Sequence, residues 1–341
     1  MKAITETASI LILTLWMLSF LTIFVIGLGY NISGQLRLAS HLQDRLKMHY
    51  LAKGGIERAT AKLDMDETPN YDSLNEECLN NEDFFREIPV GSGYVTVSYQ
   101  LEKEARDNQE TEEVTLYGLM DESSRININK APLQILKNML ENVGEVETEE
   151  AVDIANAIVD WRDADVVVST GGAEDNYYKK LKLSYPCKNG DFQILEELLL
   201  VKGMTPSTFS KITDMITIYG NGKVNINTAS WRTLYALGLN SEFAKRIVQF
   251  RRGNDEIDGT KDDNVFKTVN EIRDIGHLFT KESEEINRLI SLNALAVKSD
   301  VFRIKSTGFL KKGTRNLKGN IICVVQRSQG EKSQIVYWHE D

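Results

Sequence analysis

The chain begins with a nearly unbroken apolar stretch. Residues 10–30 are almost all apolar, and no charged residue occurs between Thr7 and Leu36. As a helix, this stretch is about 31 Å long, enough to cross a hydrocarbon core about 30 Å thick. A signal peptide is the alternative, but its apolar region is usually about 7–15 residues long and a small-residue cleavage site follows it. No such site follows Tyr30, and the sequence therefore predicts a retained membrane-spanning helix.

Beyond this stretch the pattern becomes that of an amphipathic helix. Apolar residues recur three or four positions apart, or at multiples of that spacing, with polar residues on the other faces. Because no proline occurs before Pro69, we expect one long helix over residues 7–63. Its second half forms a stalk that can pack on a sheet or on neighbouring helices. The apolar residues of that half are Leu38, Leu42, Leu46, Ile56, Ala59 and Leu63.

A period of two predicts strands on both sides of a long helical region. Two strands precede this region and three follow it, so we expect one sheet whose sequence is interrupted by an insertion. The expected strands cover residues 94–101, 114–120, 301–308, 318–327 and 334–339.

The predicted fold class is α+β, with a long N-terminal transmembrane helix, an antiparallel sheet and a large inserted α-helical domain. We divide the chain into four parts. They are residues 1–34 (leader and transmembrane helix), 35–120 (stalk helix and first strands), 121–297 (inserted helical domain) and 298–341 (last strands).

The insertion contains an internal repeat, which has to be recognised before its motifs are interpreted. Residues 125–136 align with 223–234, and both segments contain Asn-Ile-Asn followed two positions later by alanine. The repeat defines two units, residues 121–205 and 220–296. Each resembles a helix-hairpin-helix unit.

The asparagines of the repeat predict helix starts. Asn129 and Asn227 stand where an N-cap is expected, with a side-chain oxygen that accepts from the first free amides of a helix. Pro132 then falls in the first turn, where its missing N–H costs little. We interpret these residues as capping and turn chemistry.

Composition argues against catalysis and against nucleic acid. The formal net charge is −10, which opposes binding to DNA and to anionic lipid. The four histidines are scattered, and the sequence contains no HExxH, GxSxG or Walker motif. The three cysteines, Cys78, Cys187 and Cys323, lie far apart with no CxxC, so at most one disulfide is possible and burial is expected. We predict a protein that is not an enzyme.

A DNA-binding role is the alternative for the repeat, because paired helix-hairpin-helix units grip DNA phosphates. Arg251 and Arg252 favour it. The acidic residues around both units oppose it, since phosphate binding requires positive charge. We do not expect nucleic acid as a partner.

Two acidic, glycine-containing loops are candidate calcium sites. Calcium takes six to eight oxygen ligands, which clustered carboxylates supply. Neither loop matches the twelve-residue EF-hand, and the alternative is that both are solvated acidic loops. The candidate ligands are Asp163, Asp165, Glu174 and Asp175 in the first loop and Asp255, Asp258, Asp262 and Asp263 in the second.

The order of these parts resembles the minor pseudopilins of the K type in type II secretion systems, the general secretion pathway protein K family. The similarity spans nearly the whole chain. The matching segments are Leu15-Trp16, residues 118–132 (GLMDESSRININKAP), 160–165 (DWRDAD), 172–178 (GAEDNYY), 196–205 (EELLLVKGMT) and Tyr337-Trp338.

The resemblance implies a single-pass inner-membrane protein whose large domain lies in the periplasm. Counting lysine and arginine predicts the opposite orientation, because Arg37, Arg45 and Lys47 follow the span. The implied fold is a long helix against a pseudopilin-type sheet with a helical domain inserted between strands. Calcium sites are known in this family. The implied partners are other minor pseudopilins in a tip complex, the major pseudopilin filament, the inner-membrane secretion platform and prepilin peptidase.

The implied function is to nucleate, at its tip, the pseudopilus used for protein export across the outer membrane. The span agrees with a tip position. It contains no acidic residue between Glu6 and Asp44 that would need a partner in a subunit above, and a carboxylate buried in the membrane without a partner is costly. Prepilin peptidase normally cuts after a glycine directly before the apolar run. Here Ala8-Ser9 stand at that place, which departs from the family pattern and leaves open whether the chain is cut after Ala8 or keeps its N-terminus. The alternative function is a subunit of a type IV pilus or DNA-uptake machine that binds DNA through its repeat.

Overall fold

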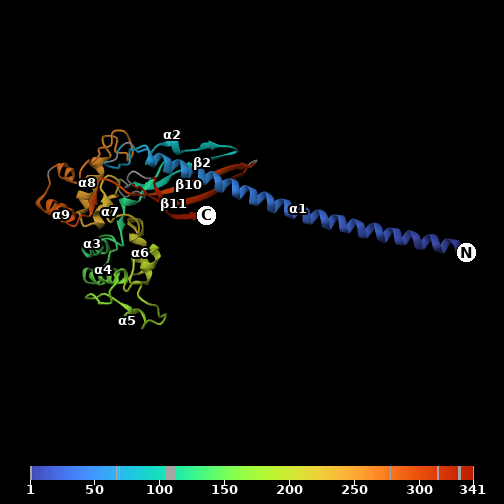
Figure 1. The fold of residues 1–341 in the computed structure, drawn as a ribbon, viewed down its shortest axis with the longest axis horizontal. Helices are drawn as coiled ribbons and strands as arrows, with labels where there is room; N and C mark the ends of the chain where they lie inside the picture. The colour runs from blue at the N-terminus through green and yellow to red at the C-terminus, as the bar shows by residue number, and fades with distance from the viewer. Residues whose placement is uncertain are drawn as a thin grey trace.

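The structure, a computed structural model, describes residues 2–66, 68, 70–103, 112–276, 278–312, 315–328 and 332–340; for residues 2–9, 102–103, 112–113, 312 and 315 this applies to the backbone alone. A long helix, α1 (Lys2–Asp64), projects from a body made of a sheet and a helical domain (Figure 1). The helical domain lies at the end of the body farthest from the N-terminus. The α+β fold class is confirmed.

Helix α1 changes its environment halfway along. The side chains from Ile10 to Leu38 are exposed, whereas Leu51, Ala52, Ile56 and others farther along are buried against the sheet. Gly308 permits the close approach, because a Cβ atom there would lie 2.5 Å from Met48 O. The amphipathic half of the helix is therefore a packing surface, and the apolar half is left uncovered by the rest of the chain.

The sheet brings both ends of the insertion together. Its order is β1-β2-β10-β11-β12, with every neighbouring pair antiparallel, and β5 also pairs with β10. Strand β5 leads into the helical domain and β10 leaves it, so the insertion begins and ends on adjacent strands. The strands are β1 (Ile88–Val90), β2 (Gly93–Val97), β5 (Met120–Asp121), β10 (Val301–Lys312), β11 (Arg315–Gln326) and β12 (Gln334–Glu340).

The expectation of a single sheet was wrong for two segments. β3 (Tyr99–Lys103) and β4 (Glu112–Leu116) form a separate two-stranded hairpin. The reason is competition for β10: strand β2 pairs with its second half, and β5 takes Phe302 and Arg303, where a continuation of β2 would pair.

The insertion folds as two equivalent units. Each is closed by a parallel pair of two-residue strands, β6 with β7 and β8 with β9. One hydrophobic core runs through both units. The first contains β6 (Ile126–Asn127), α3 (Leu133–Asn142), α4 (Thr148–Arg162), α5 (Asp175–Tyr178), η2 (Leu195–Leu200), α6 (Pro206–Ile212), η3 (Thr213–Met215) and β7 (Ile216–Thr217). The second contains β8 (Val224–Asn225), α7 (Trp231–Ala236), α8 (Ser241–Arg251), η4 (Val269–Asp274), α9 (Thr280–Ser291) and β9 (Leu295–Ala296). The first unit thus extends beyond residue 205 to Thr217; η1 (Glu122–Ser124) leads into it from β5, and α2 (Glu82–Phe85) precedes the insertion.

The N-cap assignment of the repeated asparagines was wrong. Pro132 caps α3 and Ser230 caps α7, where the Ser230 hydroxyl accepts from Thr233 N. Asn129 instead accepts from Phe192 N at 2.7 Å and donates to Phe192 O at 3.0 Å. Asn227 makes the same pair of bonds with Phe266, at 2.9 Å each. Each buried amide side chain bonds to both the N–H and the C=O of one phenylalanine, as a neighbouring strand would, and so holds a loop that is distant in sequence. Local sequence does not reveal such a contact.

The three cysteines are free and buried. Cys78 and Cys323 lie in the core between α1 and the sheet, and Cys187 lies in the core of the helical domain. The expectation that they are buried apolar residues is confirmed.

Candidate functional sites

The first acidic loop is folded back onto α4 by a buried carboxylate. Asp160, in the last turn of α4, accepts from Ser169 N at 3.1 Å and Ala173 N at 2.9 Å. Gly172 fits beside it because a Cβ atom would lie 2.1 Å from Asp160 Oδ2. Asp160 thereby takes the amides of Ser169 and Ala173, while Asp165 Oδ1 accepts from Val167 N at 2.7 Å.

Three of the predicted ligands gather at one point. Asp163, Asp165 and Glu174 each bring a carboxylate oxygen within 4.8 Å of the others. Glu174 is only 3% exposed and has the weakly donating thiol of Cys187 beside it, but among the described residues its oxygens, like Asp163 Oδ1, have no N–H or O–H partner. Burial raises the pKa of Glu174 and of Asp163, and the charge of Asp165 raises the latter further. The group is an all-oxygen, negatively charged site that fits a hard cation such as calcium.

The side chain of Asn189 offers a further candidate ligand oxygen, which the sequence did not indicate. Its Nδ2 donates to Asp165 O at 3.1 Å, which places the amide beside the loop, and its Oδ1 is buried without a partner. Its backbone has a φ of 48°, a left-handed conformation that asparagine tolerates better than most residues. Nothing in the sequence links residue 189 to residue 165.

Asp175, the fourth predicted ligand, lies outside this group. Its Oδ1 accepts from Cys187 N at 2.8 Å, and its Oδ2 accepts from Lys179 Nζ at 2.5 Å. The bond from Lys179, followed by that from Cys187, lowers the pKa of this carboxyl. Asp175 therefore holds the segment that carries Asn189, rather than offering a free oxygen.

The second acidic loop also gathers three carboxylates, those of Asp255, Asp262 and Asp263. Here the loop itself satisfies them. Asp262 accepts from Asn254 N and from Thr260 Oγ1, at 2.8 and 2.7 Å. These bonds, the one from Thr260 first, lower the pKa of Asp262 to about 2. The result is a self-bonded turn.

Asp258, the remaining predicted ligand of that loop, points elsewhere. Its Oδ2 accepts from Arg252 Nε at 2.8 Å, and its Oδ1 lies 3.9 Å from Arg251 Nη2. Asp258 therefore belongs to an ion-pair network with the end of α8.

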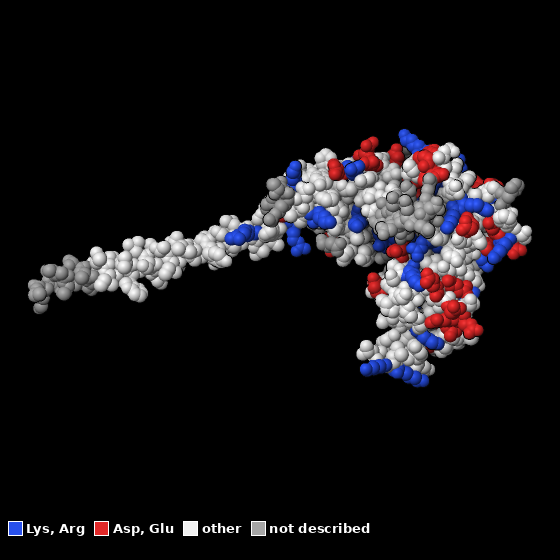
Figure 2. All heavy atoms as spheres, turned by 180° about the vertical axis from the view of Figure 1, so that it is seen from behind, with Lys and Arg blue, Asp and Glu red and all other residues white. Residues whose placement is uncertain are grey.

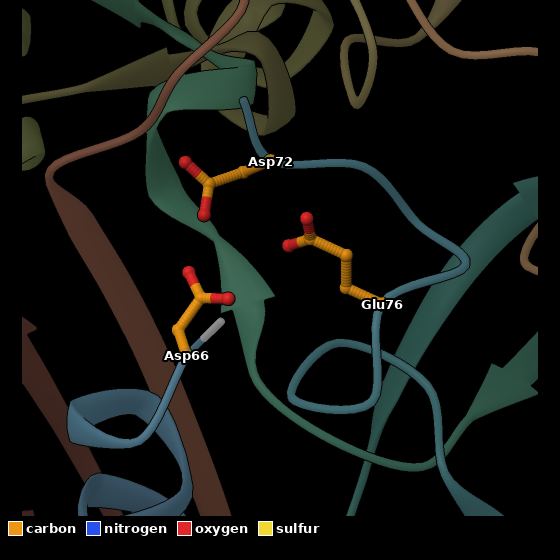
Figure 3. A group of neighbouring side chains, drawn as sticks. All are labelled: Asp66, Asp72 and Glu76. Carbon is orange, nitrogen blue, oxygen red and sulfur yellow. The ribbon is translucent and has the colours of Figure 1, made fainter. Parts of the chain in front are cut away.

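A third group of carboxylates was not predicted. Asp66, Asp72 and Glu76, in the polar stretch that follows α1, converge beside the sheet (Figure 3). The sequence showed only an acidic loop here, because the residue that pairs with two of these carboxylates, Arg327, is more than 250 positions away.

The hairpin of the second helical unit is occupied by protein contacts. The backbone carbonyls of Tyr235, Leu237 and Gly238 accept from Asn142, Asn138 and Arg288, respectively. Arg251 is buried and donates to Ile226 O and Ala229 O, as Arg162 does at the equivalent carbonyls of the first unit. Acidic side chains gather on the surface of the helical domain (Figure 2). The two arginines that favoured phosphate binding are thus both engaged within the fold.

A groove runs between the stalk and the sheet. It has a volume of 720 Å³ and is lined by Leu42, Leu46 and His49 of α1 and by residues of β11 and β12. His49 Nδ1 lies 3.1 Å from Glu340 Oε2 across it. Leu42 and Leu46 are more than half exposed, so this part of α1 offers an apolar stripe to a neighbouring chain.

The insertion carries the sequence of a known family. Residues 114–221 match the family model for protein K of the type II secretion system. Over these residues the chain is similar to type II secretion system protein K. The resemblance seen in the sequence is thereby confirmed. Residues 220–288 also match the helix-hairpin-helix motif, in agreement with the second unit of the repeat.

Curated proteins named type II secretion system protein K are similar to this chain. The protein from Pectobacterium carotovorum subsp. carotovorum is 26% identical over 225 residues, covering 62% of this chain and 64% of the relative. The protein from Aeromonas hydrophila is 33% identical over 129 residues, covering 35% and 39%. The chain thus matches less than two thirds of the length of either relative.

A solved structure has a fold similar to that of this chain. The crystal structure of the GspK-GspI-GspJ complex from the type 2 secretion system of enterotoxigenic Escherichia coli contains a chain that superimposes with a TM-score of 0.66. The match covers 89% of this chain and 99% of that one, at 14% sequence identity. At this identity the likeness concerns the fold.

Proposed function

We propose that this chain is a minor pseudopilin of a type II secretion system, located at the tip of the pseudopilus, where it nucleates the filament. The observation that carries the proposal is the arrangement in Figure 1: an apolar stalk runs into a sheet, and a helical domain covers the far end of the body. The match to protein K supports it. The solved complex of a related fold with GspI and GspJ points to other minor pseudopilins as partners.

The stalk is the proposed anchor. Helix α1 is long and apolar enough to cross a membrane, and its most apolar window is uncovered by the rest of the chain. We propose that it spans the inner membrane once, with the body in the periplasm, as the similarity to protein K implies. Before assembly, the apolar stripe around Leu42 and Leu46 would contact lipid or water. In the filament it would pack against the stalks of smaller pseudopilins. The secretion platform and the major pseudopilin are further proposed partners.

The tip position follows from shape and charge. A pilus grows by stacking subunits along their stalks, and the helical domain occupies the end of the body where a subunit above would sit. The span contains no carboxylate between Glu6 and Asp44 that would need a partner in such a subunit. Ala8 and Ser9 lie within α1, where only the backbone is described, and both possibilities, cleavage after Ala8 and an intact N-terminus, stay predictions.

Calcium is the proposed ligand of the first acidic loop. Asp163, Asp165, Glu174 and Asn189 would hold it, and Asp175 would position Asn189. The buried oxygens of Glu174 that lack N–H or O–H partners among the described residues are the specific observation in its favour, because a buried anion without a counter-charge is unfavourable. Calcium would fix the loop at the distal end of the helical domain and take no part in a reaction. No catalytic role is proposed.

The repeat is proposed to act in packing rather than in DNA binding. Its two candidate arginines, Arg251 and Arg252, donate within the helical domain and are not available to a phosphate. The acidic surface would also repel phosphate.

Site-specific photo-crosslinking in cells that carry the secretion machinery tests the proposed assembly. A photoreactive side chain at Leu42, in the groove between stalk and sheet, is expected to yield adducts with small single-span pseudopilins. The matched control is Glu149, which is exposed at the start of α4, and there we expect no such adduct. A protein that accumulates in the membrane without any adduct at Leu42, while secretion proceeds, would contradict the proposal.

A further inference from the structure

A buried ion-pair cluster lies where the stalk ends and the chain returns from the helical domain. Arg327, just after β11, donates from Nη2 to Asp72 Oδ1 at 2.6 Å. Its Nη1 lies 3.2 Å from Asp66 Oδ2, a Coulombic contact without hydrogen-bond alignment. Asp72 is fully buried, and its Oδ2 accepts from Ser299 N at 2.7 Å. Asp66, Asp72 and Arg327 thus form a triad that joins the stretch after α1 to the end of β11.

Glu76 is directed into this triad without a cation of its own. Its carboxylate points toward Asp66 and Asp72 (Figure 3), and one oxygen of each of the three residues lies within 4.8 Å of the others. Glu76 is 8% exposed. Its Oε1 accepts from the Thr68 hydroxyl, whereas its Oε2 is buried with no hydrogen-bond partner among the described residues.

The charges of the cluster do not balance. Three carboxylates face one guanidinium, and removing charges from water without a counter-charge is costly. A structural ion pair between stalk and sheet would need only Asp66, Asp72 and Arg327, so the third carboxylate requires a separate explanation.

We propose that Asp66, Asp72 and Glu76 form a second calcium site. Arg327, which contacts Asp66 and Asp72, balances the part of their negative charge that the ion does not. The available donors are all oxygens, those of the three carboxylates and of the Thr68 hydroxyl, which is the chemistry that a hard divalent cation prefers. Each carboxylate oxygen can accept more than one partner, so Asp72 retains its bonds to Arg327 and Ser299 while it binds the ion.

The position of the site gives it a structural role. Asp72 N donates to Val297 O, and Asn225 Nδ2, from the start of the second helical unit, donates to Asp72 O at 3.0 Å. A cation here would stabilise the junction at which the stalk, the sheet and the helical domain meet. This site is separate from the first acidic loop and does not depend on the assembly role of the protein.

Counting bound calcium in the full-length protein in detergent tests the proposal. Equilibrium dialysis is compared for the wild type, Glu76→Gln, Glu174→Gln and the double variant. We expect two ions for the wild type, one for each single variant and none for the double variant. Glu77→Gln is the matched control, because Glu77 is the adjacent residue, is largely exposed and pairs with Lys62; it is expected to keep both ions.

Thermal melting with and without chelator separates loss of the ion from loss of the fold. In chelator, Glu76→Gln should melt at or above the wild-type temperature, because it removes a buried charge. Addition of calcium should raise its melting temperature less than that of the wild type. A Glu76→Gln protein that binds as much calcium as the wild type would overturn the site. If Glu174→Gln has no effect while Glu76→Gln abolishes binding, the first loop fails and this site stands.

Discussion

The two acidic loops of the helical domain occupy equivalent places, one after α4 and the other after α8, yet their carboxylates differ in what they bond. In the second loop, Asp262 and Asp263 accept from backbone amides of their own turn. In the first loop, the amides of Ser169 and Ala173 bond to Asp160 instead. Asp163 and Glu174 are left with buried oxygens that have no N–H or O–H partner in the part of the chain that the structure describes.

The difference shows that the number of acidic residues does not define a calcium site. What decides is whether the loop has spare N–H and O–H donors for its carboxylates. Gly253 and Gly259 have positive φ angles, which turn the second loop tightly enough for its amides to reach Asp262 and Asp263. The carboxylates of the second loop are satisfied by their own turn, whereas the first loop keeps the buried oxygens for which we propose a cation.

The largest effect is expected from Glu174→Gln, which removes the most buried carboxylate of the first loop. We expect calcium affinity at this loop to fall at least 100-fold, about 3 kcal/mol of binding free energy, because a neutral amide replaces a charged ligand. Isothermal titration of the full-length protein measures it.

The matched control is Asp262→Asn in the second loop, which should leave the calcium titration unchanged. If Asp262→Asn reduced calcium binding and Glu174→Gln did not, the assignment of the two loops would have to be reversed.

Sequence reasoning succeeded where the information was local. The apolar run and the spacing of Ile56, Ala59 and Leu63 predicted the stalk, and internal similarity predicted a repeat whose two units are now seen. It failed where the partner is distant in sequence. Asn129 bonds to Phe192, 63 positions away, and a pattern of capping residues fits the same letters. The site at Glu76 depends on Arg327, which no motif connects to it.

The equivalent asparagines offer a second test, with a smaller effect. Asn129→Ala and Asn227→Ala should each lower the free energy of unfolding by about 1–3 kcal/mol, because each leaves buried backbone groups of Phe192 or Phe266 without partners. Chemical denaturation measures both losses.

Calcium binding should distinguish these two variants. Asn129 holds the segment that continues from Asn189, so Asn129→Ala should also weaken calcium binding at the first loop. Asn227→Ala should not, since its segment follows the self-bonded turn. Equal calcium affinities in the two variants would show that Asn189 does not contribute to the site.

The smallest expected effect is a pH dependence of the second loop. The hydroxyl of Thr260 and the amides of Asn254 and Asp255 lower the pKa of Asp262 from 3.8 to about 2 in the folded protein. The stabilisation that they provide is therefore fully present above pH 4 and is lost as the pH falls toward 2. Melting of the wild type and Asp262→Asn in chelator should show a constant difference in melting temperature between pH 5 and 7 that shrinks by pH 3.

For the first loop, the pH dependence of stability has the opposite sign, because the pKa of Glu174 is raised. Without calcium, the charge of Glu174 destabilises the fold near neutral pH. Glu174→Gln should therefore melt higher than the wild type at pH 7 but not at pH 4. Parallel pH profiles for the two variants would mean that the loops differ less than their hydrogen bonds indicate.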